Sequence, residues 1–439
     1  MSRSQVVKWL YIGLHIKRWL VLLLVGVVFM GLGFAYLLRE VYVSYTFPEW
    51  VATATLQFVP RWARGLLFIS IASVLSVLAV WRLNRSMVSA VLPDSQQGQV
   101  MDLIYQARTA QRGPRIVAIG GGTGLSNLLR GLKQYSANLT AIVTVADDGG
   151  SSGALRRDMG VIPPGDIRNC IAALADSEPL VTDLFQYRFD EGAGDQLEGH
   201  SFGNLFIVAM AKVTGSMEEA IRETSRVLRV RGRIVPSTLS DVVLAARMDD
   251  GSVVRGESKL GHTGKRIAEV TIEPGNVPVN AEAVAALREA ELVVIGPGSL
   301  YTSVLPNLLV RGLSEALLAS PGHKVFISNV ATEHGETDGM NAADLYQTVR
   351  RHLGNRDFAD VVLANSNLPA EALPAEWNSE PVVAPGDADY GSARLVLADL
   401  VDPARRYRHD SERLASQVMR LYFERDLRRA AEGVVAAPR

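Results

Sequence analysis

Residues 115–135 read RIVAIGGGTGLSNLLRGLKQY, and residues 139–146 continue the pattern with LTAIVTVA. The apolar run 115–119 predicts a strand, the glycines 120–124 predict a turn, and the leucines that follow have the spacing of a helix face. Residues 139–146 predict a second strand. This strand–helix–strand unit implies two parallel strands joined by a right-handed crossover, and therefore an α/β fold.

The same alternation of helices and strands continues along the chain. Asp249-Asp250-Gly251 separates two strand-like runs, 242–248 and 252–257, and predicts a β-hairpin. Helices are expected at 166–175, 180–187, 202–213, 217–228, 281–290, 307–319 and 342–352, and further strands at 266–272, 292–295, 324–328 and 360–363. We therefore predict a Rossmann-like, mostly parallel sheet with helices on both faces and a β-hairpin insertion.

Two apolar segments precede this α/β region. Residues 19–38 and 65–81 contain no charged side chain and have basic residues on their flanks, and a helix of about 20 such residues spans the hydrocarbon layer of a membrane. Buried core helices and a signal peptide are the alternatives, although a second apolar run seldom follows a signal peptide so soon. Basic residues are more numerous outside the hairpin than in its loop, which favours cytoplasmic ends. We predict two transmembrane helices, in a multi-pass protein of the inner (plasma) membrane with its soluble domain on the cytoplasmic side.

These patterns divide the chain into four parts. We expect a membrane anchor at 1–85, a linker at 86–114, a ligand-binding domain at 115–421 and a C-terminal tail at 422–439. The arginine-rich residues 405–429 predict one or two amphipathic helices, either packed on the edge of the domain or lying at a membrane surface.

Charge and cysteine content exclude several classes of function. The formal net charge is -1, which gives no support for a nucleic-acid partner, because such proteins present a strongly basic face. The single cysteine, Cys170, excludes an internal disulfide and a cysteine-based metal cluster. We expect it to be a small buried residue.

The glycine turn after the first strand is the first candidate binding element. A glycine-rich turn that opens a helix exposes backbone N–H groups at the positive end of the helix dipole, which is a geometry that binds phosphate. The spacing departs from the dinucleotide fingerprint, because Leu125 occupies the third glycine position, and no Gly-Lys-Ser/Thr follows as in a Walker A loop. A turn without a ligand is the alternative. The candidate ligand-binding residues here are Gly121, Gly122, Thr123 and Gly124.

A second candidate element follows the second strand. Asp147 and Asp148 stand at the strand end, where open α/β sheets bind ligands. These carboxylates are candidate ligands for Mg²⁺, and the backbone of Gly149, Gly150, Ser151 and Ser152 could form an anion-binding nest. Capping of a turn or helix is the alternative role for the two acids.

Two helix starts and a second glycine turn complete the candidate site. Asp166, Arg168 and Asn169 begin one helix, and Asn204 begins another close to His200; Asp166 could equally be an N-cap, and a lone histidine is more often structural. The turn after residues 292–295 contributes Gly296, Gly298, Ser299 and Thr302. Two such turns in one parallel sheet predict a diphosphate held across the point where the strand order reverses. No nucleophile–base pair is obvious from the sequence.

Several long blocks resemble the YvcK/CofD-like family, in the branch called gluconeogenesis factors. They include IVAIGGGTGLSNLLRGLK, AIVTVADDGGSSGALRRDMGVIPPGDIRNCIAALAD, GHSFGNLFIVAM, VLRVRGRIVPST and VVIGPGSLYTSVLPNLLV, and with GETDGM and YRHDSERLA they cover about residues 115–421. The resemblance implies binding of UDP-N-acetylglucosamine and support of cell-wall precursor supply, cell shape and gluconeogenic growth. The sister branch transfers a phospholactyl group with Mg²⁺.

The resemblance also implies further site residues and partners. Trp377 stands near the position of a family tyrosine and could stack on uracil, and Arg408 in YRHDSERLA is a candidate phosphate partner. Our main hypothesis is a membrane-tethered regulator that binds this UDP-sugar, with a regulatory protein partner in amino-sugar metabolism and a homo-oligomeric state. The alternative is a Mg²⁺-dependent transferase of phosphoryl or nucleotidyl groups. NAD is not expected as a cofactor, and the membrane hairpin departs from the common soluble members.

Overall fold

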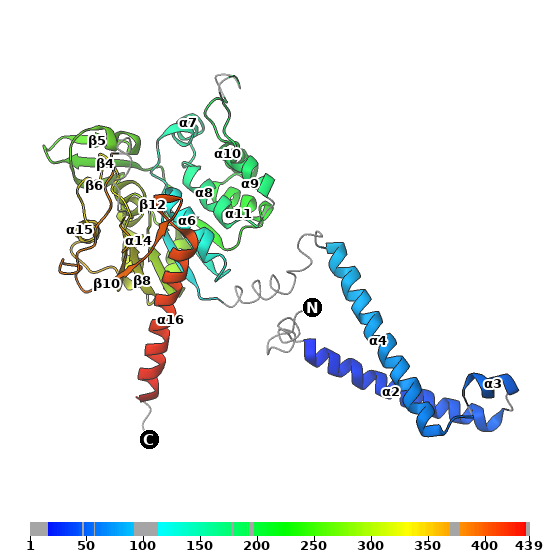
Figure 1. The fold of residues 1–439 in the computed structure, drawn as a ribbon. Helices are drawn as coiled ribbons and strands as arrows, with labels where there is room; N and C mark the ends of the chain where they lie inside the picture. The colour runs from blue at the N-terminus through cyan, green and yellow to red at the C-terminus, as the bar shows by residue number, and fades with distance from the viewer. Residues whose placement is uncertain are drawn as a thin grey trace. The chain divides into compact units, whose positions relative to one another are not determined.

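The computed structural model describes residues 16–45, 48–56, 58–91, 113–176, 179–190, 192, 197–368 and 378–435. The chain separates into two compact units, Met1–Tyr105 and Gln106–Arg439 (Figure 1). The boundary falls inside the predicted linker 86–114. Most of that linker, residues 92–112, lies outside the described residues.

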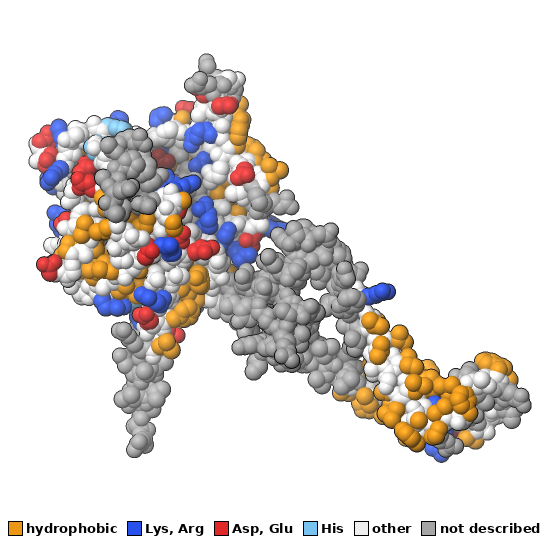
Figure 2. Space-filling view, viewed as in Figure 1, with side chains coloured by type: hydrophobic (Ala, Val, Ile, Leu, Met, Phe, Trp, Pro, Cys, Tyr) orange, Lys and Arg blue, Asp and Glu red, His pale blue; other side chains and the backbone are white. Residues whose placement is uncertain are grey.

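The described residues of the first unit form the helices α2 (Ile16–Ser44), α3 (Glu49–Ala54) and α4 (Arg61–Val91). The two predicted spans fall within α2 and α4, and large apolar side chains such as Phe29 and Ile69 are 70% and 65% exposed. Figure 2 shows hydrophobic side chains spread over these helices. In the described part of the chain, no helix combines the length and the hydropathy that crossing a membrane requires. The membrane anchor stays a prediction.

A seven-stranded parallel sheet forms the centre of the second unit. The sequence predicted a mostly parallel sheet and five of its strands, but not β3 or β10. Its order is β10-β9-β8-β7-β1-β2-β3, and every paired neighbour runs parallel. All residues of β1 and β2 are buried, because helices cover both faces of a parallel sheet. The strands are β1 (Ile116–Gly120), β2 (Leu139–Val143), β3 (Arg233–Pro236), β7 (Leu292–Ile295), β8 (His323–Ile327), β9 (Val361–Asn365) and β10 (Arg394–Ala398).

The strand order reverses between β1 and β7. The chain runs from β1 to β2 and β3 on one side, and from β7 to β8, β9 and β10 on the other. The two central strands pair in register, with Ile116 opposite Leu292 and Ile119 opposite Ile295. Both glycine turns therefore leave adjacent strand ends at the topological switch point, where open α/β sheets bind ligands.

Helices connect the strands on the two sides of this point. Because crossovers are right-handed, the reversal places α6 and α14 on opposite faces of the sheet. The helices of the second unit are α6 (Gly122–Leu132), α7 (Gly150–Met159), α8 (Gly165–Leu174), α9 (Pro179–Gln186), α10 (Phe202–Thr214), α11 (Met217–Val227), α12 (Ala281–Glu289), α13 (Leu305–Leu309), α14 (Arg311–Ala319), α15 (Ala342–His352) and α16 (Ser411–Val435). The one helix predicted at 307–319 is divided into α13 and α14 at Val310.

The predicted β-hairpin is present and gains a third strand. β4 (Val243–Met248) pairs antiparallel with β5 (Val253–Arg255) and with β6 (Ile267–Glu273). A short helical turn, η2 (Glu257–His262), follows β5. The insertion brings η2 to Asp148, whose carboxylate accepts a hydrogen bond from the backbone N–H of Ser258 at 2.9 Å.

The prediction for residues 405–429 was wrong at its start. Residues Arg405–His409 form strand β12, which pairs antiparallel with β11 (Val401–Asp402), and only then does α16 begin. The Asp410 carboxylate sets that beginning by accepting hydrogen bonds from the N–H groups of Glu412 and Arg413 at 3.0 and 2.8 Å. The predicted boundary at 421/422 lies inside α16.

Candidate functional site

A cavity of about 890 Å³ opens at the switch point, above the ends of β1 and β7. It gathers the two glycine turns, the first turns of α6, the segment after β8 and the β11–β12 hairpin. Its lining includes Gly121–Gly124, Ser126, Asn127, Arg130, Asn169, Pro297, Gly298, Ser299, Ser303, Asn329–His334, Asp402, Arg405, Arg408 and His409.

The two glycine turns touch each other, and this contact requires glycine. A Cβ atom at Gly124 would lie 2.7 Å from the carbonyl oxygen of Pro297 and 2.9 Å from the Cα of Gly298. Gly298 has a φ of +157°, and a Cβ there would lie 3.3 Å from the carbonyl oxygen of Gly121. A side chain at either position would force the turns apart, so both glycines are needed for the backbones to approach.

The buried side chain of Asn307 connects the two segments that carry the glycine turns. This fully buried side chain donates hydrogen bonds from Nδ2 to the carbonyl oxygens of Gly120 at 2.9 Å and Ser303 at 2.8 Å. Gly120 ends β1, whereas Ser303 lies in the π-helical turn η3 (Leu300–Val304) after β7. One amide thus joins the segments that follow both central strands.

The N-terminus of α6 faces the cavity. Gly121 is the N-cap residue, and the first intrahelical bond runs from the N–H of Leu125 to its carbonyl oxygen at 3.3 Å. The N–H of Gly122 donates to the carboxyl group of Asp166. The N–H groups of Thr123 and Gly124 also precede the first intrahelical bond, so they lie where an anion binds a helix dipole. The hydroxyl of Ser126 donates back to the carbonyl oxygen of Thr123 at 3.0 Å, so its hydrogen serves the helix.

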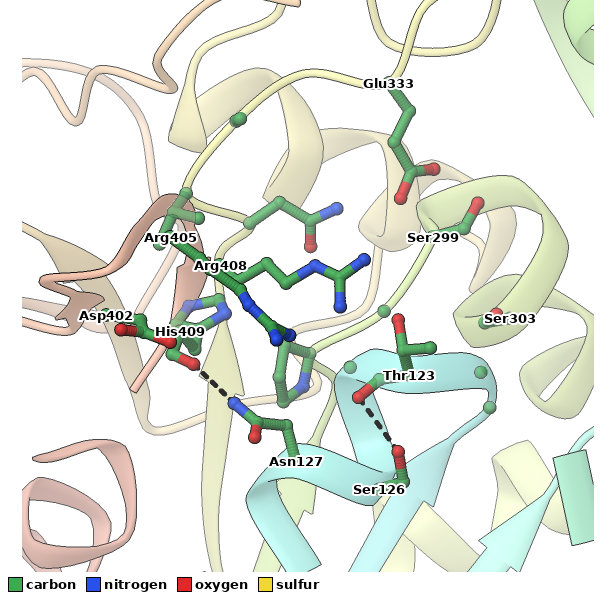
Figure 3. A pocket seen from close by; sticks show the side chains of 18 of the residues that line it. Thr123, Ser126, Asn127, Ser299, Ser303, Glu333, Asp402, Arg405, Arg408 and His409 are labelled. Atoms are coloured by element: carbon green, nitrogen blue, oxygen red, sulfur yellow. Dashed lines mark hydrogen bonds between the residues drawn. The ribbon is translucent and has the colours of Figure 1, made fainter. Parts of the chain in front are cut away.

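Three arginines line this cavity. Arg130 lies two turns along α6, and Arg405 and Arg408 come from β12. Figure 3 shows the latter two reaching toward the turn that contains Thr123. Asn127 fixes β12 against α6 by donating from Nδ2 to the carbonyl oxygen of His409. The cavity therefore combines backbone N–H groups and guanidinium groups, which suits a diphosphate.

A match to a family model described as 2-phospho-L-lactate transferase CofD covers residues 116–400. The chain belongs to the CofD/YvcK family. A provisionally named gluconeogenesis factor of Nostoc sp. is 44% identical over 434 residues, which cover 95% of this chain and 93% of the relative. A gluconeogenesis factor of Bacillus subtilis is 45% identical over 317 residues, which cover 71% of this chain and 99% of the relative.

A crystal structure of a Bacillus halodurans protein has a similar fold. It superposes with a TM-score of 0.66 at 41% sequence identity, and the match covers 70% of this chain and 99% of that protein. The α/β fold with its helix-flanked parallel sheet is thus shared with a solved relative.

A smaller cavity of about 250 Å³ adjoins the first and gathers most of the other predicted residues. Asn169 lines both cavities. The lining of the smaller one comprises Asp147, Gly149–Ser152, Gly165, Asp166, Arg168, Asn169, Arg188 and Asn204. The sequence did not predict one contact here. Ser151 Oγ lies 3.0 Å from His200 Nδ1, and the distance of these two residues along the chain gave no sign that they form a serine–histidine pair.

Three carboxyl groups in and near the cavities have raised pKa values: Asp166 lines the smaller cavity, whereas Glu257 and Glu336 line neither. Burial, together with the charge of Asp147, raises the pKa of Asp166 to about 7, and burial with the nearby Asp147 and Asp148 charges raises the pKa of Glu257 to about 7. Burial and the neighbouring Glu333 raise the pKa of Glu336 to about 8. These groups therefore exchange protons near neutral pH.

The two carboxylates predicted to hold Mg²⁺ serve different neighbours. Asp147 lines the smaller cavity and accepts from the N–H of Gly149 at 2.9 Å, whereas Asp148 is turned toward Ser258 in η2. Within the described ranges, no group of three acidic, histidine or cysteine side chains is placed to hold a metal ion. Magnesium stays a prediction.

Two other predicted residues, Gly296 and Thr302, belong to neither cavity lining. Gly296 is buried at the end of β7 with a φ of +79°, and Thr302 is buried in η3, where its hydroxyl bonds Glu257. Trp377 lies outside the described residues. The sequence analysis did not predict Asn127 and Arg130 as site residues, although their helical spacing from the glycine turn could have shown them. It also did not predict residues 329–334, which follow strand β8 at the same edge of the sheet.

Asp166 gives a test of this electrostatic arrangement. Its pKa is raised from an ordinary 3.8 to about 7, so the stability contributed by its neutral form is lost as pH rises between these values. In Asp166→Asn the amide oxygen can still accept from Gly122, and no charge develops. We expect the melting temperature of the variant minus that of the wild type to increase from pH 4 to pH 7 and to stay constant above pH 7.

The exposed Asp158→Asn variant is the matched control on the neighbouring helix α7. The described environment of Asp166 is contradicted if the difference for Asp166→Asn is flat from pH 4 to pH 7, or if it changes no more than the difference for the control.

Proposed function

We propose that the switch-point cavity binds UDP-N-acetylglucosamine and that the protein acts as a regulator of cell-wall precursor supply through this ligand. The observation that carries the proposal is the contact between two glycine turns at the ends of adjacent central strands, beside three arginines. A diphosphate has two charged groups that match two such turns. The volume of about 890 Å³ is in the range of cofactor-sized sites.

The family adds support for a metabolic role. Relatives at 44–45% identity bear the name gluconeogenesis factor, and support of cell shape and gluconeogenic growth fits a protein that responds to a sugar nucleotide. A regulatory partner in amino-sugar metabolism and a homo-oligomeric state belong to the same proposal. Trp377 is proposed as the stacking partner of the uracil ring.

One observation favours a second candidate, a transferase of phosphoryl or nucleotidyl groups. The smaller cavity meets the larger one at Asn169, so a second reactant could lie beside a bound nucleotide. Such transfers depend mainly on positioning and on charge neutralisation, to which Mg²⁺ near Asp147 would contribute. Turnover of UTP with a sugar phosphate, abolished in Asp147→Ala while nucleotide binding persists, would establish this candidate.

Nucleotide binding can be measured by calorimetry on the purified full chain. We expect UDP-N-acetylglucosamine to bind and GDP and NAD to bind far more weakly or not at all. Loss of a charge-assisted hydrogen bond costs about 1.5–3 kcal/mol, so Arg408→Gln should weaken binding roughly 10- to 150-fold. The exposed Arg420→Gln on α16 should leave the affinity unchanged. Absence of binding by any uridine nucleotide would refute the proposal.

We also propose that α2 and α4 anchor the chain in the inner membrane with the second unit on the cytoplasmic side. The exposed apolar side chains of these helices support the anchor. The Nostoc relative, aligned over 95% of this chain, necessarily includes most of the first unit.

Membrane fractionation tests the anchor directly. The full chain should sediment with membranes and resist extraction by high salt, whereas a chain lacking residues 16–91 should remain in the supernatant. Recovery of the full chain in the supernatant would show that the hairpin does not insert.

A further inference from the structure

The smaller cavity has the features of a second binding site. It lies between the N-terminal ends of α7 and α8 and the start of α10. Its walls are closely packed, since a Cβ at Gly165 would lie 2.4 Å from Ser152 Oγ and one at Gly203 would lie 2.9 Å from Arg168 Cδ. Its volume of about 250 Å³ is below that of typical cofactor sites, so its occupant is smaller than a nucleotide.

One side of this cavity presents cationic and N–H donors. The Arg168 side chain is only 8% exposed and donates to Asn169 Oδ1 at 3.0 Å, yet its Nε has no partner among the described residues. Arg188 stands beside it, held by pairing of its backbone with Ser201. The N-terminus of α7 adds N–H groups, because Gly149 is its N-cap without a side-chain cap.

The other side presents acceptors. Asn204 is 2% exposed, donates from Nδ2 to Ser151 Oγ at 3.0 Å, and leaves Oδ1 without a partner among the described residues. Ser151 can then pass its own hydrogen to a neutral His200 whose Nδ1 accepts, which is consistent with this Asn204 amide orientation. The Asp147 carboxylate also lines the cavity, at the N-terminus of α7, where it accepts from the N–H of Gly149 at 2.9 Å. A buried unpaired acceptor is costly unless a ligand supplies a donor.

We propose that this cavity binds a small phosphorylated polyol, such as a sugar phosphate, beside the nucleotide cavity. The phosphate lies against Arg168, Arg188 and the N-terminus of α7, and the hydroxyl groups donate to Asn204 Oδ1 and Asp147. This pairing assigns a partner to Arg168 Nε and to Asn204 Oδ1, the two buried atoms of the cavity lining that lack one among the described residues. Inorganic phosphate would leave the acceptors unpaired, and a metal cation would face two arginines.

Calorimetry with three probes tests both halves of the site. We expect glucose 6-phosphate to bind the full chain more tightly than inorganic phosphate, and glucose to give no measurable binding. Arg188→Gln should weaken the binding of glucose 6-phosphate about tenfold, as expected for one charge-assisted hydrogen bond. Asp147→Asn should weaken the binding of glucose 6-phosphate without weakening that of inorganic phosphate.

The exposed Arg157→Gln on α7 is the matched control and should bind all probes as the wild type does. The proposal is overturned if glucose 6-phosphate does not bind, if Arg188→Gln binds it as tightly as the wild type, or if saturating UDP-N-acetylglucosamine displaces it. Because the probes are measured without nucleotide first, their failure is distinct from failure of nucleotide binding at the switch point.

Discussion

The close contact between the glycine turns after β1 and β7 is the constraint on which the site depends. A side chain at Gly124 would meet the Pro297 carbonyl oxygen at 2.7 Å, and Asn307 joins the two segments from the buried side. The parallel register of β1 and β7 brings both turns to one edge, and the reversal of strand order there leaves room above them. The position of the cavity therefore follows from the register and order of the strands together with the close contact of the two turns.

The chemistry around this contact has two unlike regions. The larger cavity offers backbone N–H groups and the guanidinium groups of Arg405 and Arg408, which favour a diphosphate. In the smaller cavity burial raises the pKa of Asp166 to about 7, and burial raises the pKa of the neighbouring Glu257 to the same value. Carboxyl groups that are partly neutral reduce the repulsion of a bound anion and can donate hydrogen bonds to it. Partly protonated carboxyl groups and arginine side chains can therefore bind the same anionic ligand.

Local sequence patterns predicted five strands of the central sheet and both turns, but not β3 or β10. The continuous apolar runs and the leucine spacing of α6 predicted β1, α6 and β2, because these signals depend on neighbours in the chain. Strand β12 was mistaken for helix, since its arginine-rich sequence pairs with β11 through backbone bonds that no local pattern reports. The Ser151–His200 contact and the place of Arg188 beside Arg168 arise from segments far apart in sequence, so only the structure shows them.

A crystal structure of the full chain with bound UDP-N-acetylglucosamine tests the central claim most directly. We predict that the two phosphates lie within hydrogen-bond distance of backbone N–H groups in both turns, one from residues 123–124 and one from residues 298–299. A complex in which the nucleotide binds elsewhere and both turns remain without a phosphate would contradict the account.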